Sequence, residues 1–543
     1  MTKQSILRYL TNKLFCDFGE SWGESTLNKK KLSSAKIVIL MMLIMIATKF
    51  FGFIREILLG QQFGTSFYTD AYIVALTVPT IIFGSIMAAV STSFIPIYSK
   101  IKHQNGMKRA NYFTNNLLSI ITMLSIILAV IGFFVSKFIV KILGAGLSAE
   151  GYNLAVSLTR ISLLMLVALG VIAVLTVFLQ AEERFIISSL INIPIILTVI
   201  ISLFFVELIG IKGVMYANVI GSIFQILILI YYARRQIEFK LVFNLKDNNI
   251  KELFALVFPV LIATSVQQIN LLIDRMLASS FGDGYISALS FGSKINEMFF
   301  GLISVTIATF IFPKLSNLAT KNSMKEFNDL VRTSLNTVSI LILPLVFIVL
   351  LFSIDIVKLL FERGEFDHNS TITTANALFY YSFGMLFFGF RDVLNRTYYS
   401  IGDTKSPMKN AIVTVAFNIL LSLILMNIIG YKGLALSNSL AGIVTCVILF
   451  TSLNKRIPSF NYLQFIFDQL KIIISSLIMI IVTWLIFNYV WNYSGENSAI
   501  IIIKLGSSIF GGIIIYVIML LILKLEEVNE ITNIIKEKIR KRE

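Results

Sequence analysis

The chain has 543 residues, of which 57% are hydrophobic and only 14% are charged, and its mean hydropathy is +0.84. A soluble domain of this length does not carry so much apolar sequence, so the composition indicates an integral membrane protein. The net charge of +16 does not indicate nucleic-acid binding, because the basic residues stand in the connectors between apolar runs. These runs are about twenty residues long, which favours helices over the short alternating strands of a β-barrel.

Residues 1–35 are polar and contain the basic run from Lys29 to Lys31. A long apolar run follows without a small-residue cleavage site, so we interpret 1–35 as a cytoplasmic extension ahead of an anchor helix and not as a signal peptide. Apolar windows of spanning length then predict about fourteen helices. They lie near 36–58, 68–92, 112–136, 155–180, 186–206, 211–233, 252–281, 286–312, 333–354, 372–395, 407–428, 433–453, 471–491 and 499–524.

Basic residues concentrate in the even-numbered connectors between these helices, and the odd-numbered connectors hold few. The positive-inside rule therefore places both termini in the cytoplasm, including a basic tail at 525–543. An even number of helices agrees with this orientation. The expected location is a multi-pass position in a membrane, with both termini on its cytoplasmic side.

An internal repeat links two parts of the chain, since residues 209–214 read IGIKGV and residues 429–434 read IGYKGL. Each segment runs from the end of one helix over a short external turn into the next, six helices apart. We infer two homologous six-helix lobes, 36–235 and 252–456, with two additional helices at 471–524. Chance recurrence of a short turn in an isoleucine-rich chain is the alternative.

Four charged residues stand beside or within the first two apolar runs: Lys49, Arg55, Glu56 and Asp70. An unpaired charge there costs roughly 2.5 to 3.5 kcal/mol, so these side chains are expected to face a cavity. A bend at Gly52 would bring Lys49 and Arg55 towards one space, and Asp70 can pair with Arg55 at the start of the second helix. In the simpler interpretation, Arg55 and Asp70 lie at the external rim and cap helices.

A second polar cluster occupies helices seven and eight. In the simplest interpretation, Lys294 and Glu297, three residues apart, neutralise each other along one helix face. In the functional interpretation, each half of the chain contributes a cation to a central cavity, because binding a diphosphate group requires several cations. Arg160 and Arg391 are weaker candidates, expected at the rim or wall. The cluster consists of Gln267, Gln268, Asn270, Asp274, Ser293, Lys294, Asn296 and Glu297.

Enzymatic chemistry has little support in this sequence. Cys16 and Cys446 are far apart, and both histidines, His103 and His368, lie in connectors. We found no Walker loop, dinucleotide fingerprint, nucleophile elbow or zinc-binding pair. We therefore expect a transporter without a cofactor or bound catalytic metal, driven by a coupling ion or by the membrane potential.

The segments 51–56, 63–64, 69–72 and 93–96, together with Pro79, resemble the N-terminal signature of the MurJ/MviN lipid II flippases. Segments 311–316 and 402–407 are also similar to that family, which belongs to the multidrug/oligosaccharidyl-lipid/polysaccharide exporter superfamily. The resemblance implies an all-α protein with fourteen transmembrane helices in two lobes. It further implies alternating-access translocation of lipid II, the polyprenyl-diphosphate-linked peptidoglycan precursor.

The same resemblance implies that Lys49, Arg55 and Lys294 bind the diphosphate, while Glu56, Asp70 and Glu297 hold these cations in place. It also implies a groove for the polyprenyl tail at helices 13 and 14. The expected partners are lipid II or a related undecaprenyl-diphosphate-linked glycan, membrane lipids and cell-wall synthesis proteins, with no nucleic acid. We expect the protein to be a monomer, since the sequence carries no signal of oligomerisation.

Two departures from the family pattern leave the glycan open. Lysine stands at Lys49 and Lys294 where the family has arginine, and segment 80–84 lacks an expected pair of arginines. A capsule, teichoic-acid or other exopolysaccharide lipid-linked precursor is therefore an alternative substrate. A drug or cation antiporter is a further alternative, but it would require more acidic than basic cavity residues. A scaffold for cell-wall enzymes would have no need to bury charges.

Overall fold

The computed structural model describes residues 34–321, 323–454, 460–490 and 498–528. The expected cytoplasmic extension and basic tail lie almost wholly outside these residues. The described part of each predicted apolar window lies mostly in helical segments, and the described residues include no strand. The all-α prediction is therefore confirmed.

The N-terminal half consists of long apolar helices, several of them bent or broken. α3 covers two predicted helices and the connector between them, with a break at Gly106, whose φ is 77°. Predicted helix four is divided at Leu163, and predicted helix five is divided near residues 191–192. The helices are α2 (Ser34–Phe63), α3 (Phe67–Leu143), α4 (Ala149–Ser162), α5 (Leu164–Ala181), α6 (Phe185–Leu190), α7 (Ile193–Phe204) and α8 (Val206–Ala233).

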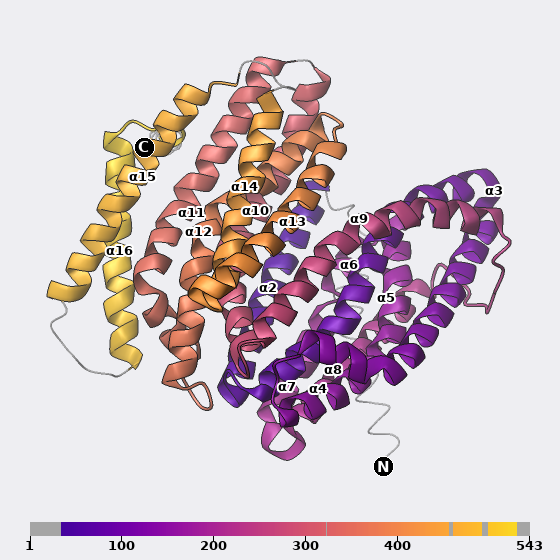
Figure 1. Cartoon of the computed structure of the whole chain (residues 1–543). Coiled ribbons are helices and arrows are strands. Elements are labelled where there is room, and N and C mark those ends of the chain that lie inside the picture. The colour runs from indigo at the N-terminus through magenta and orange to yellow at the C-terminus, as the bar shows by residue number, and fades with distance from the viewer. Residues whose placement is uncertain (1–33, 322, 455–459, 491–497, 529–543) are drawn as a thin grey trace, which may run out of the picture.

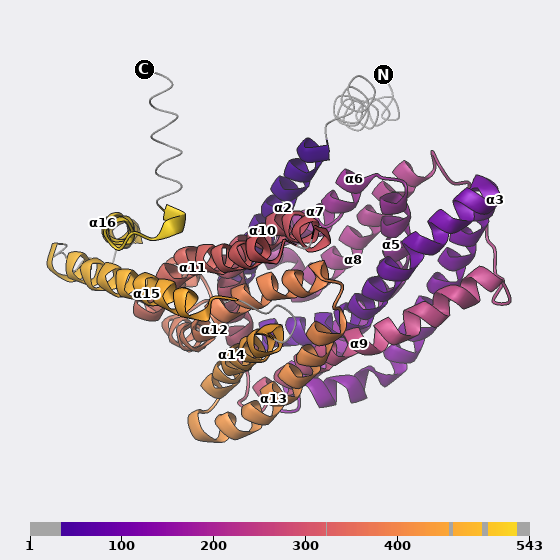
Figure 2. The ribbon, with the colours of Figure 1, turned by 90° about the horizontal axis from the view of Figure 1, so that it is seen from above.

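The C-terminal half repeats this plan and adds two helices at its edge. α15 and α16 lie side by side next to α11, away from the N-terminal half (Figure 2). The helices are α9 (Asn248–Ser279), α10 (Tyr285–Thr320), α11 (Met324–Phe361), α12 (His368–Ser400), α13 (Lys405–Ile429), α14 (Lys432–Asn454), α15 (Tyr462–Leu485), the short π-helix η1 (Ile486–Val490) and α16 (Ser498–Ile522).

By length and apolarity, nine helices in the described ranges qualify as membrane spans. The number is ten if the bent pair Tyr285–Gly301 and Thr306–Thr320 is counted as one span. The 77-residue α3 counts only once, although it contains two predicted windows. The fold is consistent with the fourteen predicted spans, and that number stays a prediction.

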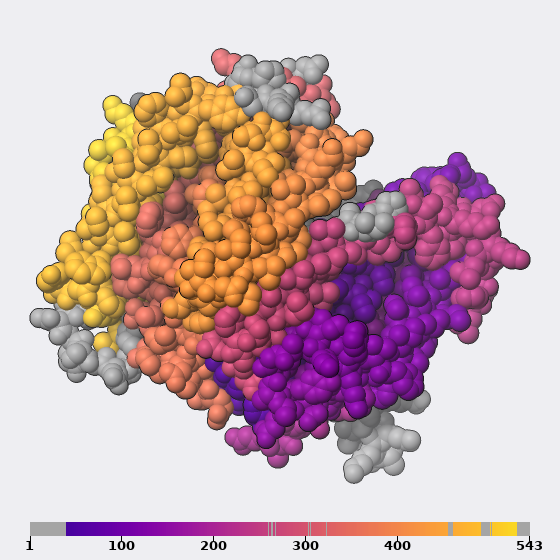
Figure 3. Space-filling model, in the orientation of Figure 1, coloured from indigo at the N-terminus to yellow at the C-terminus, as the bar shows by residue number. Residues whose placement is uncertain are grey.

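The two halves meet at one end of the molecule and diverge towards the other (Figure 1). α9 crosses between them. Its beginning is held to α3 by ion pairs of Glu252 with Lys100 at 3.0 Å and of Asp247 with Arg109 at 2.5 Å. Further along, Asn270 of α9 accepts a hydrogen bond from Asn418 of α13 at 2.9 Å. The surface of α9 accordingly adjoins both halves (Figure 3).

The repeated segments have the same backbone turn. Gly210 has φ 60° and ψ −175°, and the corresponding Gly430 has φ 66° and ψ −149°. This conformation is essentially restricted to glycine. Its occurrence at matching places supports a duplication, while the lobe boundaries inferred from it stay a prediction.

Candidate functional site

The carboxylate of Asp70 joins the two halves. Asp70 lies in the first turn of α3, is fully buried, and accepts hydrogen bonds from the backbone N–H groups of Gly284 at 2.6 Å and Ser287 at 2.7 Å. These groups belong to the first turn of α10, where N–H groups have no partner within the helix and a negative charge is favoured. The expected pair of Asp70 with Arg55 is therefore not formed. Asp70 caps a helix, but that helix belongs to the other half, and Asp70 is buried and not at an exposed rim.

Three further hydrogen bonds surround Asp70. The Glu365 N–H donates to the Gln61 carbonyl at 2.9 Å, and Thr65 Oγ1 donates to Ser370 Oγ at 2.6 Å. The Ser148 N–H donates to Asp283 Oδ1 at 3.1 Å. All these groups lie in or beside odd-numbered connectors, so the halves are joined on the side that the charge pattern predicts to be external.

The backbones approach so closely here that side chains are excluded. A Cβ added at Gly64 would lie 2.3 Å from the Glu365 carbonyl oxygen, and one added at Gly364 would lie 2.3 Å from the Gln61 carbonyl oxygen. Both glycines also have φ near +60°. The two connectors thus form a tight contact that would have to separate for anything large to pass at this end.

Arg55 lies on α2, nine residues before Gly64 of this contact. Its guanidinium pairs with the carboxylate of its neighbour Glu56. The Arg55 side chain is 28% exposed and that of Glu56 is 13% exposed. Glu56 therefore neutralises part of the Arg55 charge, while the guanidinium keeps donors that face away from this single bond.

Lys49 and Lys294 come from different halves and lie along one face of α10. A Cβ added at Gly301 of α10 would lie 3.1 Å from the Lys49 Nζ. Lys294 precedes Gly301 by seven residues, which on a helix is the same face, roughly 10 Å away along the axis. The structure thus places Lys49 against the helix of the other half that carries Lys294, 245 residues further along the sequence.

Lys294 also pairs with Glu297 along α10, at 3.0 Å, as the simpler interpretation predicted. Both side chains remain well exposed, at 43% and 52%. An exposed pair of this kind is weak, so it leaves Lys294 available to a second anion.

The sequence analysis missed Arg275 of α9. Its guanidinium donates to the Ile286 carbonyl at 3.3 Å and to Ser290 Oγ at 3.5 Å, and its buried Nε has no partner among the described residues. Together with Asp274 and Glu297, Arg275 lines a cavity of about 190 Å³.

A second correspondence between the two halves, Phe63-Gly64 with Phe281-Gly282, would have pointed to this arginine. Glu56 and Asp274 each stand seven residues before a Phe-Gly pair, and each has an adjacent arginine. Arg55 precedes its acidic neighbour and Arg275 follows it. Both halves therefore carry an acid–arginine pair at matching places, in opposite order.

A second polar cavity of about 330 Å³ lies within the C-terminal half, between α9, α12, α13 and α14. Arg391 lines it beside Asp392, with which it pairs at 3.1 Å, so Arg391 is a cavity-wall residue as expected. Asn270 donates to Asp274 at 3.2 Å and accepts from Asn418. These bonds connect the wall of this cavity to the Asp274–Arg275 pair.

Together the features define a membrane transporter with two helical halves, joined at one end and bearing cations from both halves along α10. The chain matches the family described as "Lipid II flippase MurJ" over residues 59–504. It belongs to that lipid II flippase family, as segments 51–56 to 93–96 indicated, and it is a transporter and not an enzyme.

Relatives from other bacteria match over most of their length. The "Probable lipid II flippase MurJ" of Buchnera aphidicola subsp. Baizongia pistaciae is 28% identical over 464 residues, covering 83% of this chain and 89% of the relative. The "Lipid II flippase MurJ" of Burkholderia cenocepacia is 25% identical over 455 residues, covering 81% of this chain and 88% of the relative.

Solved structures agree with this assignment. The structure titled "Lipid II flippase MurJ, inward closed conformation" has a TM-score of 0.75 at 27% identity, covering 89% of this chain and 98% of its own. An inward-facing multidrug resistance MATE family transporter of the MOP superfamily has a TM-score of 0.64 at 15% identity, covering 78% and 99%. The second likeness concerns the fold alone.

Proposed function

We propose that this protein translocates lipid II from the inner to the outer leaflet of the bacterial cytoplasmic membrane by alternating access. The observation that carries the proposal is the placement of Lys49 beside Gly301, on the face of α10 that also bears Lys294. Cations from both halves can then contact one diphosphate, which requires several positive groups. Both termini are cytoplasmic in this proposal, as the distribution of basic connectors supports.

In this proposal the cations have different roles. Lys49, Arg55, Lys294 and the additional Arg275 attract the diphosphate, and Glu56 and Glu297 hold Arg55 and Lys294 until the substrate replaces them. Asp70 acts away from the substrate, because its two hydrogen bonds keep the external end closed. Rocking of the halves would break those bonds, with an ion gradient or the membrane potential as the energy source.

The proposal can be tested by complementation in a bacterium whose own lipid II flippase is depleted, with externally exposed lipid II assayed in the same cells. The wild type is compared with Arg55→Ala and Lys294→Ala, and with Lys251→Ala, an exposed lysine outside the cavities described. We expect rescue by the wild type and Lys251→Ala and failure of the other two at equal expression. Rescue by both cavity variants would contradict the proposed diphosphate site.

Segment 80–84 favours a second candidate substrate, another polyprenyl-diphosphate-linked glycan. A Cβ added at Gly84 would lie 3.2 Å from the side-chain nitrogen of Gln268, so this segment adjoins a neutral amide and carries no cation of its own. If a well-expressed wild type exposes no lipid II but restores export of a capsule or teichoic-acid precursor, this candidate replaces the first. Contacts with cell-wall enzymes and a monomeric state belong to the proposal as well.

A further inference from the structure

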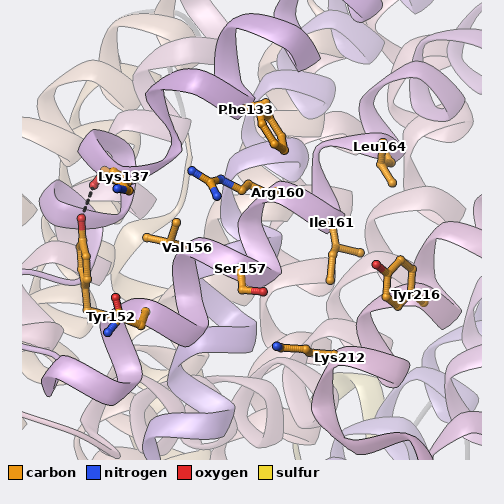
Figure 4. A pocket seen from close by; sticks show the side chains of 11 residues that line it. Phe133, Lys137, Tyr152, Val156, Ser157, Arg160, Ile161, Leu164, Lys212 and Tyr216 are labelled. Atoms are coloured by element: carbon orange, nitrogen blue, oxygen red, sulfur yellow. Dashed lines mark hydrogen bonds between the residues drawn. The ribbon is translucent and has the colours of Figure 1, made fainter.

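A separate cavity of about 590 Å³ lies in the N-terminal half, between the end of α3, α4 and the beginning of α8 (Figure 4). It is on the side where the two halves are joined, since Lys137 and Lys212 lie in or beside odd-numbered connectors of the predicted helices. None of its lining residues belongs to α10, so it is distinct from the site of Lys49 and Lys294.

The lining of this cavity is positively charged. Lys137 of α3, Arg160 of α4 and Lys212 of α8 all line it, and no carboxylate is among its described lining residues. Within the described ranges, none of these three cations forms an ion pair. Glu150 and Glu207, the nearest acidic residues along α4 and α8, are exposed outside the lining. Three unpaired cations around one cavity repel each other unless an anion is present.

Arg160 is fixed in a position suited to binding an anion. Its Nε donates to the buried Ser136 Oγ at 3.1 Å, and its guanidinium carbon lies 4.9 Å from the centroid of the Phe133 ring. These contacts leave both terminal nitrogens free for the planar, two-point recognition of phosphate oxygens typical of arginine. Figure 4 shows the guanidinium extending towards Lys137 and the Lys212 ammonium pointing into the same space.

The two helices that carry Lys137 and Arg160 are also held together. The Tyr152 hydroxyl of α4 donates to the Lys137 carbonyl of α3 at 3.0 Å. The backbone positions from which Lys137 and Arg160 extend are therefore set by the fold and do not depend on a ligand.

The edge of the cavity is apolar and open. Phe133, Leu164 and Tyr216 line it and are 45%, 55% and 49% exposed. All three lie on helices apolar enough to span the membrane, so these exposed surfaces adjoin lipid chains. A ligand here would have a charged group among the cations and an apolar part along the edge, and the volume is typical of small-molecule sites.

We propose that this cavity binds the phosphate of a membrane lipid between Arg160, Lys137 and Lys212, with the lipid chains along Phe133, Leu164 and Tyr216. Two lipids share this chemistry, an anionic phospholipid and the transported polyprenyl-diphosphate-linked glycan as it leaves, for which undecaprenyl diphosphate supplies the common lipid-diphosphate part. The site does not depend on which glycan the transporter carries.

The test is lipid binding to the full-length detergent-solubilised protein, measured by native mass spectrometry with phosphatidylglycerol, undecaprenyl diphosphate and neutral diacylglycerol as probes. The variants are Arg160→Gln and the double variant Lys137→Gln/Lys212→Gln. Lys141→Gln is the matched control, because Lys141 is an exposed lysine one turn beyond Lys137 and does not line the cavity. Within the described residues, the exposed side chains of Lys137 and Lys212 form no hydrogen bond or ion pair, so the double variant keeps the test valid if Arg160→Gln fails to fold.

We expect a phosphate-bearing probe to bind with about tenfold lower affinity to the double variant than to the wild type and Lys141→Gln, while diacylglycerol binds equally weakly to all. The probe that shows this loss identifies which of the two lipids occupies the site. Equal binding of both phosphate-bearing lipids to all variants would overturn the proposal. So would binding of inorganic phosphate that is lost in the double variant while binding of both phosphate-bearing lipids is unchanged, because the cavity would then hold a free anion and not a lipid.

Discussion

The Asp70 carboxylate caps the first turn of α10 from the opposite half of the protein, with the Gly284 N–H donating to it at 2.6 Å. The two residues are 214 positions apart in the sequence. Charge-assisted hydrogen bonds contribute roughly 1.5 to 3 kcal/mol each, so this contact is a major part of what holds the external end closed.

Asp70→Asn should weaken that closure. The amide retains only one acceptor oxygen, so at least one of the two backbone N–H groups loses its partner. We expect lower thermal stability and fewer molecules with the external end closed. The second effect is measured as faster labelling of a Thr65→Cys thiol by a water-soluble thiol reagent. Glu150→Gln, an exposed acidic position on the same side, is the control and should change neither quantity.

A disulfide between Thr65→Cys and Ser370→Cys should lock the closed end. The two hydroxyl oxygens are 2.6 Å apart, so paired sulfurs can form without a large backbone shift. We expect oxidation to stop lipid export and a reductant to restore it, in a background lacking Cys16 and Cys446. Each single-cysteine variant should remain active under oxidation, and an active crosslinked double variant would show that this end need not open.

Arg275→Ala should abolish export, although the sequence analysis did not select this residue. Its Nε is buried without a partner among the described residues, and its loss would also leave Asp274 without its adjacent cation. Export in depleted cells is the measurement, at expression equal to that of the wild type. Arg234→Ala, which removes an exposed arginine at the end of α8, should export normally.

Arg332→Ala should loosen α15 and α16 from the rest of the protein. Arg332 of α11 pairs with Asp468 of α15 at 3.1 Å and with Glu526, just beyond α16, at 2.8 Å. Asp468 is buried, and removing one partner of a buried pair typically costs about 3 to 5 kcal/mol. The Glu526 pair is more exposed and adds little.

The measurement for Arg332 is the unfolding midpoint of the purified protein. Arg332→Met combined with Asp468→Leu should recover part of the loss, because the buried carboxylate of Asp468 is then no longer left without its cation, whereas buried Glu527 remains. If Arg332→Ala were as stable as the wild type, the ion pairs of Arg332 with Asp468 and Glu526 would not be what holds α15 and α16 to α11.

Sequence patterns located the helices well and their ends poorly. The segment 93–111 was expected to be largely a connector, yet α3 continues through it with a break only at Gly106. Apolarity marks where a helix crosses a membrane, whereas hydrogen bonding within the helix continues in polar sequence beyond it. The charged residues of the first two helices were found because a charge in an apolar run is conspicuous.

The partners of those charges were not predictable in the same way. Asp70 contacts backbone N–H groups, which every residue possesses and which therefore leave no sequence signal. The approach of Lys49 to Gly301 likewise depends on how α2 and α10 pack. Arg275 was predictable, since aligning Phe63-Gly64 with Phe281-Gly282 places Asp274 opposite Glu56, with Arg275 adjacent to Asp274.

The attachment of α9 at both ends has a mechanical consequence. Ion pairs from Asp247 and Glu252 clamp its beginning to one half, and Asn270 clamps it to the other. A change in the angle between the halves would therefore have to bend or shift the stretch of α9 between these contacts, or break one of them. The energy needed to bend or shift this stretch would then oppose any change in the angle between the halves.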